Sequence, residues 1–117
     1  MRLFLADDQR DVRSALRLLL EQQGDMQVAG EAAGAAELLD RLPLAGCDVL
    51  LVDWDLPGLD ACRLLAGLRR ANPPVRVIAL TTSPLSVPIV ASVRKSDPPQ
   101  RLLDAIHAAD PAASGAR

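Results

Sequence analysis

Aromatic side chains are nearly absent from this sequence of 117 residues, which contains one Phe, one Trp and no Tyr. Proteins that bind single-stranded nucleic acid stack the bases on aromatic rings, and Phe4 and Trp54 alone do not provide such a platform. An excess of positive charge is missing as well, because the formal net charge at pH 7 is -2. We therefore expect no nucleic-acid binding by this domain itself.

Long apolar segments are also missing. Nothing approaches the roughly 20 apolar residues of a membrane-spanning helix, and the apolar residues 3–6 meet Asp7 at once, too early for a secretory signal peptide. The two cysteines, Cys47 and Cys62, lack metal-ligand spacing, and we expect both to be reduced packing residues. The composition thus predicts a cytoplasmic protein without membrane contact.

The length and composition that remain are those of one globular domain. Half of the residues are apolar and 24% are charged, which is ordinary for a soluble fold with a real core. The last residues are Ala, Ser, Gly and Pro, and they predict a flexible tail or linker. We expect a domain over residues 1–109 and a tail over residues 110–117.

The central apolar run, residues 49–52, organises the rest of the chain. It is too short for a helix and ends abruptly at Asp53, which predicts a strand that is buried on both faces. Asp55 follows two residues later, and Pro57-Gly58 turn the chain. Because ligands bind at the carboxyl ends of parallel strands, Asp53 is a candidate site residue.

Short apolar runs alternate with segments of helical periodicity along the whole chain, which predicts an α/β fold with a parallel sheet and helices on both faces. The predicted strands lie within residues 3–6, 26–31, 49–52, 75–80 and 89–93. One predicted helix ends before Pro43. The last helix is predicted to begin with a capping box, in which Asp97 is the N-cap and Gln100 the third helical residue.

Acidic residues follow two of these strands, those within residues 3–6 and 49–52, and the topology brings them to one edge of the sheet together with Thr81, which follows residues 75–80. Asp7, Asp8 and Asp53 then repel one another, by roughly 3 kcal/mol for a pair about 5 Å apart at an effective dielectric of about 20. A fold keeps such a cluster where a cation binds. Hard oxygen ligands in an open pocket favour Mg²⁺, and a carboxylate beside Mg²⁺ can act as a nucleophile toward phosphorus.

The sequence contains 13 basic residues, of which 12 are Arg and one is Lys. That single Lys95 closes the last predicted strand. A compact ammonium at a strand end suits contact with a phosphate, whereas an isolated lysine is more often a solvated surface residue. The position and the singularity of Lys95 favour a functional role.

Four motifs in order, LADD near the start, DWDLPG in the middle, LTT after the fourth strand and RKS before the last helix, resemble those of response regulator receiver domains (CheY-like) in two-component signalling. The resemblance covers the whole chain and implies a flavodoxin-like, five-stranded parallel sheet in the order 2-1-3-4-5. It also implies a phosphoprotein that takes a phosphoryl group from a histidine kinase or phosphotransfer domain and forms no membrane contact. A homodimer is compatible with the resemblance.

Carried over residue by residue, the resemblance makes Asp53 the phosphoacceptor and Mg²⁺ the cofactor. Asp8 and Asp53 would ligate the metal with the backbone carbonyl of Asp55, and Asp7 would ligate it directly or through water.

Two further residues, Thr81 and Lys95, would stabilise the phosphoryl group. The domain would catalyse only its own phosphorylation and dephosphorylation, so it would not be an enzyme in the usual sense.

The sequence departs from the family pattern between Thr81 and Lys95. Only 13 residues lie there, too few for the strand of about five and the helix of about eleven residues that the family places in this interval. We therefore expect the fourth helix to be missing or reduced to a turn. Ser92 also stands where the family carries an aromatic residue.

Other readings of the same residues remain open. An atypical pseudo-receiver would dock partners without phosphorylation, and the short interval favours it. A phosphatase of the haloacid dehalogenase type also has an Asp-x-Asp motif at a strand exit, like Asp53 and Asp55, but it would leave Asp7 and Asp8 unused. An FMN site is disfavoured because the anionic cofactor would face the same two carboxylates.

Overall fold

Five parallel strands form one sheet in the computed structural model, which describes residues 1–70, 75–82 and 91–110. Their order across the sheet is β2-β1-β3-β4-β5, so the predicted flavodoxin-like arrangement is confirmed. The strands are β1 (Arg2–Ala6), β2 (Gln27–Ala32), β3 (Val49–Asp53), β4 (Arg76–Thr81) and β5 (Ala91–Arg94).

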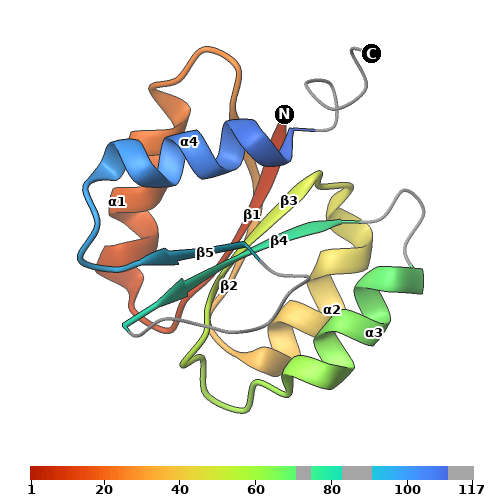
Figure 1. Ribbon diagram of the computed structural model, residues 1–117. Helices are drawn as coiled ribbons and strands as arrows, with labels where there is room; N and C mark the ends of the chain where they lie inside the picture. Colours follow the sequence, from red (N-terminus) through yellow and green to blue (C-terminus); the bar gives the residue numbers. More distant parts are fainter. Residues whose placement is uncertain (71–74, 83–90, 111–117) are drawn as a thin grey trace.

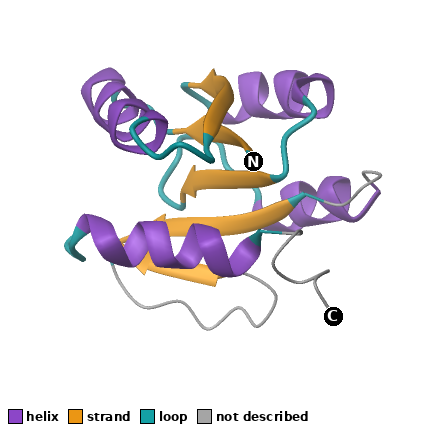
Figure 2. Cartoon of the chain, turned by 90° about the horizontal axis from the view of Figure 1, so that it is seen from above, coloured by secondary structure: helices purple, strands orange, loops and turns teal. Residues whose placement is uncertain are grey.

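Helices cover both faces of the sheet. In the described residues they are α1 (Arg10–Glu21), α2 (Ala35–Ala45), α3 (Ala61–Arg70) and α4 (Pro99–Ala109). Figures 1 and 2 show α1 and α4 on one face and α2 and α3 on the other. Parallel strands with crossover helices produce this layered arrangement, because each crossover returns the chain to the same edge of the sheet.

The strands are buried on both faces, as their continuous apolar sequence predicts. Every residue of β3 is buried, and successive side chains enter opposite cores. Leu50 and Val52 pack in the core under α2 and α3, whereas Val49 and Leu51 pack in the core under α1 and α4. This double burial fixes the direction and register of β3, and it places Asp53 at the carboxyl edge.

Backbone hydrogen bonds hold the chain where it leaves the sheet. The amide of Asp7 donates to the carbonyl of Ala32 at 3.1 Å, and the amide of Trp54 donates to the carbonyl of Leu80 at 2.9 Å. The amide of Lys95 donates to the carbonyl of Thr81 at 2.8 Å. The first residue after each of β1, β3 and β5 is therefore fixed by a neighbouring strand.

The prediction that a helix ends before Pro43 is wrong, because α2 continues through Pro43 to Ala45. Proline costs a helix one backbone hydrogen bond. Here the burial of Leu38 and Leu42 on the same helix outweighs that loss. The helix ends instead at Gly46, whose φ of 62° is the left-handed conformation that glycine adopts without strain.

The predicted capping box of the last helix is also wrong. The N-cap of α4 is Pro98, and no side chain caps the helix. Asp97 Oδ2 accepts instead from the backbone amide of Arg94 at 3.1 Å, and Gln100 Nε2 donates to Asp104 Oδ1 at 2.8 Å. Asp97 therefore closes the turn between β5 and α4, one residue too early to cap the helix.

Two predictions fall on residues outside the described part of the chain. The helix that the family places between Thr81 and Lys95, predicted to be missing or reduced to a turn, falls on residues 83–90 and is not the helix labelled α4. The predicted flexible tail falls on residues 111–117. Within the described residues, no helix has the length and apolar character needed to cross a bilayer.

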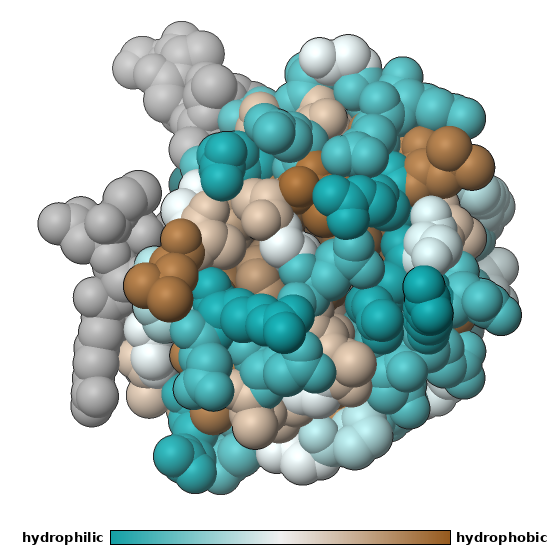
Figure 3. Space-filling model, turned by 180° about the vertical axis from the view of Figure 1, so that it is seen from behind, coloured by the Kyte–Doolittle hydropathy of each residue, from teal (hydrophilic) through white to brown (hydrophobic). Residues whose placement is uncertain are grey.

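The face of the molecule shown in Figure 3 is largely polar. On the face shown in Figure 3, hydrophobic side chains form small separate groups among hydrophilic ones. Large exposed hydrophobic residues among those described are Leu18, Leu39 and Leu44. Cys47 is buried as expected, but Cys62 is exposed, so the prediction that both cysteines are packing residues is wrong for Cys62.

Candidate functional site

Three carboxylates meet at the carboxyl edge of the sheet. Asp7 and Asp8 follow β1, and Asp53 is the last residue of β3. One carboxylate oxygen from each lies within 4.8 Å of the others. Asp7 and Asp53 are only 2% and 3% exposed, whereas Asp8 is exposed. The structure thus brings together the acidic residues that the sequence placed at this edge.

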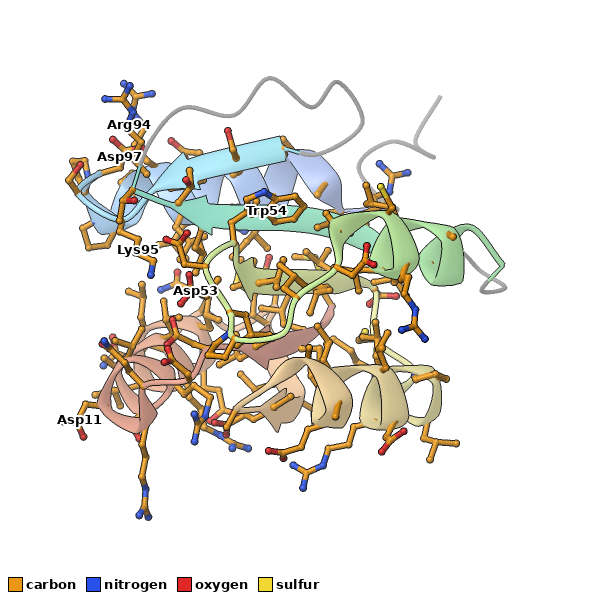
Figure 4. The ribbon with its side chains drawn as sticks, turned by 90° about the horizontal axis from the view of Figure 1, so that it is seen from below. Asp11, Asp53, Trp54, Arg94, Lys95 and Asp97 are labelled. Atoms are coloured by element: carbon orange, nitrogen blue, oxygen red, sulfur yellow. The ribbon has the colours of Figure 1, made fainter. Side chains whose placement is uncertain are left out.

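Asp53 is held by two donors on the same oxygen. Lys95 Nζ lies 3.0 Å from Asp53 Oδ1, and the backbone amide of Asp55 donates to the same oxygen at 3.0 Å. Figure 4 shows Lys95 reaching from the end of β5 toward Asp53, while Arg94 points away from it. The only lysine of the sequence therefore forms an ion pair with the candidate phosphoacceptor.

The charge of Lys95 is stabilised by this arrangement. Partial burial lowers the pKa of Lys95, but the hydrogen bond and charge of Asp53, with the charges of Asp7 and Asp55, outweigh it and raise the pKa above its usual value. The ammonium is thus charged across the physiological range.

The environment of Asp7 suits a divalent cation. The backbone amide of Gln9 donates to Asp7 Oδ1 at 2.8 Å, but Asp7 Oδ2 is buried and has no hydrogen-bond partner. Burial, together with the charges of Asp53 and Asp8, raises the pKa of Asp7 despite the opposing effects of Gln9 and Lys95. A buried carboxylate oxygen without a donor, beside two further carboxylates, is a donor set for a hard cation.

Two other predicted site residues lie at the same edge. Thr81 is the last residue of β4 and is 4% exposed, and its neighbour Leu80 pairs in register with Asp53. Asp55 has an exposed side chain and approaches Asp53 through its backbone. The structure therefore places Asp55 beside the Asp53 carboxylate through its backbone amide, and Thr81 one residue beyond the β4 position that pairs with Asp53.

Comparison with known proteins agrees with this geometry. The sequence matches the response regulator receiver domain over residues 3–105, which is most of the chain. The chain belongs to this family.

Relatives of this receiver include regulators of transcription. It is 30% identical over 117 aligned residues to the uncharacterized transcriptional regulatory protein YxjL of Bacillus subtilis, covering 93% of this chain and 54% of YxjL. It is 30% identical to the nitrate/nitrite response regulator NarP of Escherichia coli, covering 89% of this chain and 52% of NarP. The receiver therefore spans about half the length of these curated relatives.

Solved structures place this receiver in the same fold. RcsB from Salmonella enterica serovar Typhimurium, bound to promoter rprA with phosphomimetic BeF3-, superposes with a TM-score of 0.81 at 29% identity, covering 93% of this chain and 61% of RcsB. The receiver domain of NarL from Mycobacterium tuberculosis superposes with a TM-score of 0.79 at 23% identity, covering 92% and 93% of the two chains, and supports the fold alone.

Sequence reasoning missed two charged residues, Arg13 and Glu31, that support the acidic edge of this receiver. Arg13 of α1 donates from Nη1 to the backbone carbonyl of Asp7 at 2.6 Å, and its Nε lies 3.2 Å from Glu31 Oε1 on β2. The spacing of Arg13 and Arg17, four residues apart, places both on one helix face. That spacing alone does not reveal a carbonyl partner, because it contains no information about the turn that precedes the helix.

Proposed function

We propose that this receiver accepts one phosphoryl group on Asp53 from a histidine kinase or a phosphotransfer domain, with Mg²⁺ as cofactor. The ion pair at 3.0 Å between Asp53 and the only lysine of the chain, beside two further carboxylates, carries the proposal. Three negative charges and one positive charge at this edge leave an excess of two, which a divalent cation would neutralise.

The carboxylates of Asp7, Asp8 and Asp53 would hold Mg²⁺ together with the backbone carbonyl of Asp55, and their convergence within 4.8 Å supports the assignment of the three side chains. When bound, Mg²⁺ lowers the repulsion between the carboxylates and an approaching phosphoryl group. Asp7 contributes an oxygen that has no protein donor to compete for it.

The two oxygens of Asp53 differ in their hydrogen-bond partners. Both hydrogen bonds that its carboxylate accepts from described residues end on Oδ1. In our proposal Oδ2 therefore attacks the phosphorus in line with the leaving group. A phosphorus–oxygen bond forms as the bond between phosphorus and the histidine nitrogen breaks, and its electron pair leaves on the imidazole.

Lys95 and Thr81 would then stabilise the product. The ammonium of Lys95 is already at Asp53, and it needs only a small movement to contact a phosphoryl oxygen. The hydroxyl of Thr81, from the adjacent strand, would donate to another phosphoryl oxygen. Water later hydrolyses the acyl phosphate, so the receiver acts on its own aspartate and on no other substrate.

A phosphodonor assay tests this function. Incubation with acetyl phosphate and Mg²⁺, followed by intact-protein mass spectrometry, should show one added phosphoryl group in the wild type and none in Asp53→Asn. Asp11→Asn is the matched control, because Asp11 is exposed on α1 and points away from the site (Figure 4). It should be phosphorylated like the wild type.

Absence of uptake by a folded wild type would instead support the pseudo-receiver, which docks partners without phosphate. With the family established, the haloacid dehalogenase reading has no remaining support.

We further propose that the receiver works in the cytoplasm. Because its relatives are transcriptional regulators about twice as long, we expect it to control transcription where it is joined to an output domain. A homodimer stays a prediction.

A further inference from the structure

We propose that Arg13 is a positioning residue for the metal ligands of this receiver, an inference that rests on the proposed function. The carbonyl that accepts from Arg13 Nη1 at 2.6 Å belongs to the peptide between Asp7 and Asp8. Both carboxylates are proposed ligands. A single side chain of α1 therefore fixes the peptide that joins two ligands.

Among the described residues, one backbone hydrogen bond links the β1–α1 turn to the sheet. The amide of Asp7 donates to the carbonyl of Ala32 at 3.1 Å, which ties the turn to β2. The side chain of Asp7 is then oriented by the amide of Gln9, at 2.8 Å. Arg13 supplies the hydrogen bond to the carbonyl and so restricts rotation of the peptide plane. Without it, mutual repulsion would drive the two carboxylates apart before a cation binds.

Glu31 determines where Arg13 points. Its Oε1 lies 3.2 Å from Arg13 Nε, and both side chains are mostly buried, at 16% and 27% exposure. Glu31 is itself held on β2 opposite Leu5, and its carbonyl accepts from Arg41 Nη1 at 3.0 Å. The guanidinium thus bridges a fixed carboxylate and a carbonyl through two different nitrogens, a geometry that its planar fork provides and an ammonium does not.

The same ion pair keeps the guanidinium out of the acidic pocket. A positive charge free to turn toward Asp7 and Asp53 would compete with Mg²⁺ for the carboxylates. Pairing with Glu31, which Arg17 also contacts, holds the Arg13 guanidinium on the β2 side and leaves the pocket to Lys95 and the metal. Groups that orient metal ligands without touching the metal commonly change metal affinity about 10–100-fold when they are removed.

Arg17 provides a matched control. It lies one turn further along α1 and forms an ion pair with the other oxygen of Glu31 and, at 3.4 Å, with Glu21. Its described hydrogen bonds end on these two glutamates and none on the β1–α1 turn. Replacing Arg17 thus removes a similar charge from the same helix face and leaves the carbonyl of Asp7 bonded to Arg13.

The experiment compares wild type, Arg13→Gln, Arg13→Lys and Arg17→Gln. Isothermal titration calorimetry with Mg²⁺ should show dissociation constants raised about tenfold or more for Arg13→Gln and by an intermediate factor for Arg13→Lys. Arg17→Gln should stay within about twofold of the wild type, because its ion pairs are partly exposed. Hydrogen exchange of the Gln9 amide, measured in chelator, should accelerate in Arg13→Gln and not in Arg17→Gln.

The chelator measurement does not depend on any metal. If the wild type binds no Mg²⁺ and takes up no phosphoryl group, the proposed function fails, while Gln9 exchange still decides whether Arg13 orders the turn. If the wild type does both, equal Mg²⁺ affinities and equal exchange in the two Gln variants would overturn the role of Arg13 alone. Should Arg13→Gln fail to fold, the Arg13→Lys variant decides by the same two measurements.

Discussion

Replacing Asp7 by Asn should stabilise the metal-free protein. The Asp7 carboxylate is buried, its Oδ2 has no donor, and one of its oxygens lies within 4.8 Å of one oxygen each of Asp8 and Asp53. At that separation and an effective dielectric of about 20, each pair repels by roughly 3 kcal/mol. The attraction of Lys95 and the solvent around exposed Asp8 offset most of this energy, so we expect a net gain of about 1 kcal/mol in the free energy of unfolding.

The substitution keeps the useful part of the side chain. The amide oxygen of Asn can still accept from Gln9, and the amide nitrogen replaces the unpartnered Oδ2 with a donor that faces two carboxylates. For a domain of this size, about 1 kcal/mol corresponds to a rise of about 4 °C in Tm.

The pH dependence has a definite sign. Burial raises the pKa of Asp7 in the folded state above its ordinary value of 3.8, so the folded protein binds the proton more tightly than the unfolded chain. Stability of the wild type therefore falls as pH rises from about 4 through the raised pKa. Asn does not titrate, so the advantage of Asp7→Asn should be absent below about pH 4 and complete above the folded-state pKa.

Thermal unfolding followed by circular dichroism, in chelator and across this pH range, measures the effect. Adding Mg²⁺ should stabilise the wild type more than the variant, because only the wild type has its full set of ligands. Asp11→Asn is the control for loss of one negative charge on the surface. A lower Tm for Asp7→Asn than for the wild type in chelator at neutral pH would refute the crowding of the carboxylates.

Three further predictions follow from the same structure. The folded-state pKa of Lys95 is raised by neighbouring carboxylates, so the stability difference between wild type and Lys95→Gln should be constant from neutral pH to about pH 10 and should shrink as pH rises through that pKa, measured by urea unfolding. Gly30→Ala should lower the free energy of unfolding by about 2 kcal/mol, because the added Cβ would lie 2.7 Å from buried Phe4; Gly24→Ala, which meets no atom within 4 Å, is the control and should stay near wild type. Pro43→Ala should raise that free energy by about 1 kcal/mol, since it restores a helical amide inside α2, and an unchanged or lower denaturant midpoint would contradict this.

The sequence predicted the sheet well because its strands are buried on both faces. A continuous apolar run such as residues 49–52 does not fit the pattern of an amphipathic helix. Its short length and its polar ends therefore identify a strand without tertiary information. β2 is weaker in sequence, and the structure explains why. Ala29 is skipped in its pairing with β1, and Gly30 packs directly on the ring of Phe4, so packing with β1 rather than local propensity defines this strand.

Helix ends were predicted less well because each depends on competition between local and tertiary interactions. Pro43 is a helix breaker by its own chemistry, but the burial of Leu38 and Leu42 keeps α2 helical beyond it. Asp97 has the right residue type for an N-cap, but its carboxylate accepts from the amide of Arg94 in the preceding turn. Sequence spacing identifies these candidates and does not decide which partner a carboxylate takes.

The acidic edge was predictable because parallel topology fixes where strand ends meet. Asp7, Asp8 and Asp53 needed only the strand assignments to be placed together. The orientation within the edge was not predictable. That both donors to Asp53 end on Oδ1, and that Arg13 reaches the carbonyl of Asp7, depend on side-chain rotamers and loop geometry that residue types alone do not specify.

The hydrogen bond from the Lys95 amide to the Thr81 carbonyl, at 2.8 Å, makes the ends of β4 and β5 one mechanical unit. If the hydroxyl of Thr81 and the ammonium of Lys95 both follow the oxygens of a phosphoryl group, neither backbone can shift without displacing the other. The amide of Asp97 donates to the carbonyl of Arg94 in the turn that leads to α4, so a displacement of β5 would reach the start of that helix. Phosphorylation would thus shift the ends of β4 and β5 together and displace the start of α4, and this motion would not require an aromatic residue at position 92.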